Sequence, residues 1–222
     1  MTWVELEAAD GHRLRAYRAE PEGVPRGGVV VVQEIFGVND HIRAVVNQYA
    51  GAGYVALAPA FFDRVERGVE LGYDEESFAR GRALVGNLAY ESMLLDLDAA
   101  SEAARGDGKA GAMGYCFGGA VVWVAAAAPK SKLSCAVSYY GSRITNFMDK
   151  APRIPMMLHV GRLDASLPMD KVHALGSRYP EVVIHEYDAG HGFNCNARPS
   201  YQPEAAALAF QRTLAFLGEH VG

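Results

Sequence analysis

The sequence predicts an α/β fold whose mostly parallel sheet carries helices on both faces and is entered through an antiparallel hairpin. Strand-like runs alternate with helical periods from Val29 to the end of the chain, an order typical of parallel sheets. The run Val29–Val32 is uniformly β-branched, as expected for a strand buried on both faces. With 222 residues, 50% of them hydrophobic, the chain is expected to form one domain, 1–222.

The first elements are two runs of alternating polar character, 2–8 and 12–20, joined by Asp10 and Gly11. This dipeptide suits a type I′ turn, so the runs are predicted to pair as a hairpin at the edge of the sheet. Six further strands are predicted at 29–34, 54–59, 109–116, 133–141, 154–164 and 182–190. Six helices are predicted at 39–53, 74–87, 90–107, 117–128, 166–180 and 203–220, from start signals and apolar spacing.

The composition favours a small molecule as the partner. The net charge is -5 and no run of Lys or Arg occurs, which argues against nucleic acid or an anionic membrane. The longest strongly apolar run, Ala120–Ala128, is too short to span a bilayer, and a cytoplasmic location is expected. The three cysteines, Cys116, Cys135 and Cys195, show no zinc or redox spacing, so no disulfide, metal or cofactor is predicted.

A cysteine occupies the turn predicted between strand 109–116 and the helix that follows it. Cys116 lies between Gly114 and Gly118, the G-x-nucleophile-x-G pattern of a strained strand-to-helix elbow. A side chain at either glycine would collide with the neighbouring strand and helix. The N–H of Phe117 is expected to face an oxyanion beside the sulfur, and the positive helix end behind it favours the thiolate.

Three more reactive residues follow predicted strands: Glu34, Asp164 and His191. In parallel sheets such residues gather on loops beyond the carboxyl ends of the strands. The order nucleophile, acid, histidine along the chain suits a triad in which His191 takes the thiol proton and Asp164 fixes its tautomer. Glycines on both sides of His191 leave its loop compliant. Asp164 could instead cap the next helix, and Glu34, Asp164 and His191 could alternatively bind a metal.

Six segments together resemble the dienelactone hydrolase family, also called carboxymethylenebutenolidases. They are "VVVVQEIFGVND", "MGYCFGG", "SYYG", "HVGRLDASLP", "DAGHGF" and "AAALAFQRTLAFL", and they cover nearly the whole chain in order. The resemblance implies an α/β-hydrolase fold without a large lid domain, and hydrolysis of a cyclic enol ester that bears a carboxylate, through an acyl-thioester. The partner would thus be a small carboxylated ester or lactone.

The resemblance also assigns roles at the site. The family's Cys, Asp and His triad falls on Cys116, Asp164 and His191. Its glutamate falls on Glu34, which would contact the resting thiol and take its proton when substrate arrives. The backbone N–H groups of Ile35 and Phe117 would form the oxyanion hole. Electrostatics is consistent with the role of Glu34 at the resting thiol, because a carboxylate beside a thiol disfavours the thiolate.

The chain departs from the family at the residues that hold the substrate carboxylate. The family has an arginine four residues after the catalytic histidine, where this chain has Cys195. The candidates for substrate binding are Tyr140, Arg80, Arg143 and Arg198.

Other functions stay open at this point. The same triad could serve a carboxylesterase or thioesterase with other substrates. The pocket could also bind an organic acid without hydrolysing it. A monomer and a homodimer are both compatible with the sequence.

Overall fold

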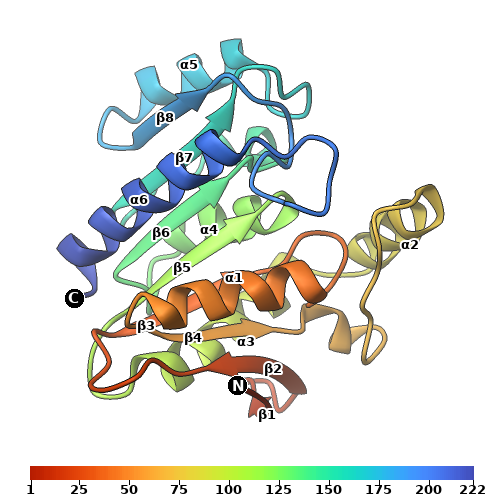
Figure 1. Cartoon of the computed structure of the whole chain (residues 1–222), viewed down its shortest axis with the longest axis vertical. Coiled ribbons are helices and arrows are strands. Elements are labelled where there is room, and N and C mark those ends of the chain that lie inside the picture. The colour runs from red at the N-terminus through yellow and green to blue at the C-terminus, as the bar shows by residue number, and fades with distance from the viewer.

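The computed structural model describes all 222 residues, Met1–Gly222, and its centre is one eight-stranded sheet (Figure 1). The strand order is β1-β2-β4-β3-β5-β6-β7-β8. Only the β1–β2 and β2–β4 pairs are antiparallel, which confirms the predicted α/β fold with an N-terminal hairpin at the edge. The strands are β1 Thr2–Glu7, β2 Arg13–Ala19, β3 Gly28–Val32, β4 Val55–Pro59, β5 Ala110–Tyr115, β6 Cys135–Tyr139, β7 Met156–Gly161 and β8 Val183–Tyr187.

The predicted helices are all present. They are α1 Asp40–Gly51, α2 Glu75–Gly86, α3 Tyr90–Arg105, α4 Phe117–Ala127, α5 Met169–Arg178 and α6 Pro203–His220. Two short 3₁₀ helices, Phe61–Arg64 and Ile144–Phe147, were not predicted, since a single turn leaves no periodic signal. None of the helices is both long and apolar enough to span a membrane.

The first hairpin turns differently from the prediction. Gly11 has a φ of +80°, but Asp10 is not among the residues with positive φ, so the turn is not type I′. The Gly11 N–H donates to the Ala8 carbonyl at 2.8 Å, and the Ala8 N–H donates to the His12 carbonyl at 2.9 Å. This is the longer loop in which a tight turn is followed by one left-handed glycine.

The helices cover both faces of the sheet (Figure 1). Helices α1 and α6 lie in front of it in this view, and α3 and α4 lie behind. The central strands β3 and β5 are buried along their whole length, so each needs apolar side chains on both faces. Strands β3, β5, β7 and β8 run parallel to one another. They therefore end at one common edge of the sheet, where the loops that follow them can meet.

Candidate active site

Cys116 lies at a strained turn between β5 and α4. Its φ of 54° and ψ of -115° are sparsely populated for a residue with a side chain and cost about 1–3 kcal/mol. The Cys116 N–H donates to the Tyr139 carbonyl, and the Cys116 carbonyl accepts from Ser142 N–H, at 3.0 and 3.1 Å. These bonds tie the turn to the end of β6 and hold the sulfur at the top of the sheet.

Two glycines make this turn possible. A Cβ on Gly114 would lie 2.0 Å from the Gly118 carbonyl oxygen, and one on Gly118 would lie 2.5 Å from the Val32 carbonyl oxygen. Real side chains do not approach backbone this closely. The collision predicted from the sequence is therefore present at both positions, and only glycine lets α4 begin directly against β3 and β5.

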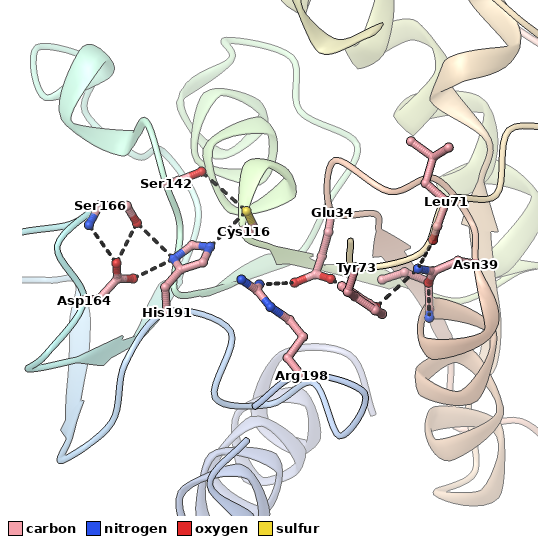
Figure 2. Close-up of polar contacts among 11 residues, drawn as sticks. Glu34, Asn39, Leu71, Tyr73, Cys116, Ser142, Asp164, Ser166, His191 and Arg198 are labelled. Carbon is pink, nitrogen blue, oxygen red and sulfur yellow. Dashed lines mark hydrogen bonds and ion pairs between the residues drawn. The ribbon is translucent and has the colours of Figure 1, made fainter. Parts of the chain in front are cut away.

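Three residues that the sequence predicts to act together do meet at this edge (Figure 2). His191 Nε2 lies 3.0 Å from Cys116 Sγ, and His191 Nδ1 lies 2.8 Å from Asp164 Oδ2. Cys116 comes from the β5–α4 turn, Asp164 from the loop after β7 and His191 from the loop after β8. The side chains form a continuous chain of hydrogen bonds from sulfur to carboxylate.

The protonation of His191 follows from its two partners. Burial would lower the pKa of His191, but its hydrogen bonds to Asp164 and Cys116, with the charges of both, raise it above its ordinary value. Burial would raise the pKa of Asp164, and the hydrogen bond and charge of His191 lower it instead. The Asp164 carboxylate thus favours the charged, imidazolium form of His191.

Two serines that the sequence analysis did not select complete this group. The Ser166 N–H and Oγ–H both donate to Asp164 Oδ1, at 2.8 and 2.6 Å, and Ser166 Oγ lies 2.9 Å from His191 Nδ1. Ser142 Oγ lies 3.7 Å from Cys116 Sγ. Ser166 lies two residues after Asp164, the spacing at which an Asp side chain commonly accepts from a backbone N–H in a turn, and it could have been found on that ground.

The comparisons with known proteins agree with this architecture. The sequence profile of the Dienelactone hydrolase family matches residues 14–221. The chain belongs to the dienelactone hydrolase family. It is therefore a hydrolase.

Relatives and solved structures match over nearly the whole chain. The chain is 33% identical to a carboxymethylenebutenolidase of Pseudomonas putida, over 96% of this chain and 94% of that protein. It is 30% identical to carboxymethylenebutenolidase 1 of Cupriavidus pinatubonensis, over 96% and 95%. A crystal structure from Klebsiella pneumoniae, assigned to the dienelactone hydrolases, superposes with a TM-score of 0.84 at 28% identity, covering 99% of this chain and all of that one.

Glu34 does not point where family resemblance led us to expect. The hydrogen-bond partners of Cys116 Sγ are His191 and Ser142, and the Glu34 carboxylate lies between two other groups (Figure 2). Its Oε1 is 3.7 Å from Arg198 Nη1, and its Oε2 accepts a long hydrogen bond of 3.5 Å from the Tyr73 hydroxyl. The charged partner of the carboxylate is therefore Arg198, and no hydrogen bond joins it to the sulfur.

The three candidate arginines lie in different surroundings. Arg80 is on the exposed face of α2 and pairs with Glu66. Arg143 is exposed, and its guanidinium lies 6.0 Å from the centre of the Phe117 ring, at the rim of the site. Arg198 alone reaches the centre, where its side chain is 16% exposed.

The glycine after His191 makes room for this arginine. Gly192 has a φ of +80°, and a Cβ there would lie 2.5 Å from Arg198 Nη1. The guanidinium therefore rests against the backbone that carries the histidine. From the sequence, Gly192 was expected only to make the His191 loop flexible. In the structure, the absence of a side chain at Gly192 also leaves the space that Arg198 occupies.

Tyr140, a candidate for substrate binding, does not face an open cleft. It is fully buried, and its ring lies edge-on to the imidazole of His191, with centroids 5.2 Å apart. Its φ of 39° is left-handed, and its hydroxyl has no hydrogen-bond partner. Tyr140 therefore supports the histidine ring from below instead of lining an open surface.

Proposed function

We propose that this chain hydrolyses a small ester or lactone, bearing a carboxylate, through an acyl-thioester on Cys116. The observation that carries the proposal is the unbroken contact from Cys116 Sγ through His191 to Asp164, at 3.0 and 2.8 Å. A thiolate, a histidine and an orienting carboxylate in this arrangement are the parts of nucleophilic acyl transfer. The names of the carboxymethylenebutenolidase relatives support a lactone as the substrate.

In the first step the Cys116 thiolate attacks the carbonyl carbon. A carbon–sulfur bond forms, and the carbon–oxygen bond of the ester breaks. The enolate leaves easily and takes the His191 proton once it has left, so that His191 is neutral for the second step. In that step His191 takes a proton from water, which attacks the thioester; the carbon–sulfur bond breaks, the acid product leaves, and Cys116 Sγ recovers a proton from His191. Asp164, held by Ser166, keeps the imidazole in the productive tautomer.

The oxyanion of each tetrahedral intermediate would be bound by two backbone N–H groups. Phe117 is the first residue of α4, so its N–H lies outside the ladder of the helix. The Ile35 N–H has no acceptor among the backbone and side-chain hydrogen bonds of the chain. A Cβ on Gly81 of α2 would lie 2.1 Å from the Ile35 carbonyl oxygen, so α2 packs against this peptide and fixes its direction.

Arg198 is the proposed receptor for the substrate carboxylate. It lies within the site, it is largely buried, and its Nη1 has no hydrogen-bond partner. A substrate carboxylate would compete with Glu34 for this guanidinium. Glu34 would thereby be released toward the thiol, where it could accept the proton of Cys116, which keeps the gating role that the family resemblance implies.

A second candidate is a hydrolase of neutral esters or thioesters on the same triad. The observation in its favour is that Arg198 already faces Glu34 at 3.7 Å, so the positive charge has an internal partner. The test compares a dienelactone with neutral p-nitrophenyl esters in the wild type. We expect the carboxylated lactone to have the higher kcat/KM, and a higher value for the neutral ester would favour the second candidate.

The other readings of the site have less support. Glu34 does not share a cluster of metal-ligand atoms with Asp164 and His191, and both nitrogens of His191 face Asp164 and Cys116. Membership of a hydrolase family speaks against a protein that only binds an organic acid.

A further inference from the structure

A second group of reactive side chains surrounds Glu34 on the side away from the triad. The Glu34 carboxylate, the His41 imidazole and the Cys195 thiol each offer a ligand atom, and these atoms all lie within 4.8 Å of one another. The three residues come from the loop after β3, the first turn of α1 and the loop after β8. The proposed reaction uses Glu34 but gives no role to His41 or Cys195.

Two side-chain atoms of these residues are buried without a hydrogen-bond partner. Glu34 Oε1 and His41 Nε2 have no hydrogen bond, although Glu34 is 0% and His41 only 7% exposed. A buried polar atom without a partner costs about 1–3 kcal/mol. A cation placed between them would offset this cost, and Cys195 would supply a third ligand.

We propose that Glu34, His41 and Cys195 form a binding site for a zinc-like divalent cation. A thiolate, an imidazole and a carboxylate are the ligands that zinc prefers. Tetrahedral zinc, with bonds of about 2.0–2.3 Å, holds its ligand atoms roughly 3.5 Å apart. Small side-chain rotations would bring the three atoms to that spacing, and the fourth position would be left to water.

Neighbouring groups orient the Glu34 carboxylate. The Tyr73 hydroxyl donates to Glu34 Oε2 at 3.5 Å, and Asn39 Nδ2 donates to the Tyr73 oxygen at 3.2 Å (Figure 2). The carboxylate is thereby held at Oε2, while Oε1 makes no hydrogen bond and lies 3.7 Å from Arg198 Nη1. Such outer hydrogen bonds are typical of metal sites.

Binding would change the protonation of Cys195 without any oxidation or reduction. Burial and the charge of Glu34 raise the pKa of Cys195, so the residue is a thiol when no cation is present. As the sulfur–metal bond forms, the S–H bond breaks and the proton passes to the buffer. The cation replaces the proton as the partner of the sulfur.

A pocket gives access to this group. A cavity of about 350 Å³ lies between α1 and the segment that leads into α6, and His41 lines it together with Asn194, Asn196 and Tyr201. The His41 ring thus borders the pocket, while its Nε2 is buried. Rotation of this one ring would open a path for a small ion.

Arg198 acts against the cation. Its Nη1 lies 3.7 Å from Glu34 Oε1, so a second positive charge would be repelled. Binding is therefore expected to be of moderate strength, and Arg198→Gln should strengthen it. A bound cation would also hold Glu34 in place and slow turnover, an effect that rests on the proposed gating role of Glu34.

The test of the site uses Co²⁺ as the probe and the Cys116→Ala protein, because Cys116 and His191 could bind metal themselves. We expect one Co²⁺ per chain and a thiolate-to-cobalt absorption band in the near ultraviolet. Cys195→Ser in this background should remove the band, and His41→Gln should weaken binding by at least tenfold. The matched control, Cys135→Ala, should retain both. Circular dichroism of each variant reports whether it is folded.

The possible results distinguish a failure of the proposed metal site from a failure of the proposed function. No band, or a band that survives Cys195→Ser, would overturn the metal site whatever the enzyme does. In the protein with Cys116 intact, Zn²⁺ should inhibit ester hydrolysis, and Cys195→Ser should require at least tenfold more Zn²⁺ for the same inhibition. A band that depends on Cys195, without any such inhibition, would support the site and contradict the gating role of Glu34.

Discussion

The guanidinium of Arg198 lies 3.7 Å from the carboxylate of Glu34, and the same carboxylate has an oxygen within 4.8 Å of ligand atoms of His41 and Cys195. Family resemblance led us to expect the glutamate against the thiol. The structure instead places the thiol against His191 at 3.0 Å. The Glu34 carboxylate thus has Arg198 as its charged partner, and the nucleophile has His191.

Replacement of the nucleophile should stop the reaction with little effect on stability. We expect Cys116→Ala to lower kcat/KM for activated esters by at least about 10⁴-fold, because the other parts of a triad give little without the nucleophile. Its Tm should stay close to that of the wild type. Intact-mass spectrometry should detect an acyl adduct in the wild type and none in the variant. Cys135→Ala serves as the control, and near-normal turnover by Cys116→Ala would refute the mechanism.

Replacement of Arg198 should affect carboxylated substrates selectively. Hydrogen bonds to charged groups contribute about 1.5–3 kcal/mol, so Arg198→Gln should raise KM for a dienelactone by roughly 10- to 100-fold. The KM for a neutral ester should change little. Arg80→Gln is the matched control, because Arg80 is exposed and pairs with Glu66. Equal effects of Arg198→Gln on both substrates would show that this arginine does not recognise the carboxylate.

The charge of His191 should make its contribution to stability depend on pH. Burial lowers its pKa, but Asp164 and Cys116 raise it from 6.5 to about 10. A raised pKa stabilises the folded state fully below pH 6.5, and this contribution disappears as the pH rises through about 10. The Tm difference between wild type and His191→Gln should therefore be largest near pH 6 and shrink toward pH 10.

The same comparison in an Asp164→Asn protein tests whether Asp164 causes the raised pKa of His191. With Asp164→Asn present, the loss of stability caused by His191→Gln should vary less with pH, since one of the groups that raise the pKa is gone. A Tm difference that stays constant from about pH 6 to pH 10 would contradict the assignment.

The turn that carries Cys116 should not tolerate a side chain at Gly114. A Cβ there would lie 2.0 Å from the Gly118 carbonyl oxygen. Because the backbone would have to shift, Gly114→Ala should lower the free energy of unfolding by about 3 kcal/mol. Chemical denaturation measures this change. Gly86→Ala is the control, because a Cβ there meets nothing within 4 Å and alanine suits a helix better by about 0.5–1 kcal/mol. Equal stability of both variants would contradict the packing account.

The elements of the fold could be read from local patterns. The β-branched run before Gln33, the alternation of strands with helices and the capping residues depend on neighbours along the chain. The hairpin turn was wrong in detail, because Asp-Gly also fits a longer loop in which only Gly11 has positive φ. The short 3₁₀ helices were missed, since one turn has no period to detect.

The sequence by itself determined the order of the elements, the elbow around Cys116 and the candidates Asp164 and His191, since parallel strands that alternate with helices bring their loops to one edge. Only the tertiary structure decided the direction of the side chains on those loops. It turned Glu34 toward Arg198, buried Tyr140 beneath the imidazole and brought His41 and Cys195 together. The loop from 190 to 202 has no period of its own, so its path depends on tertiary contacts such as those of Arg198 with Gly192 and with the Tyr73 ring.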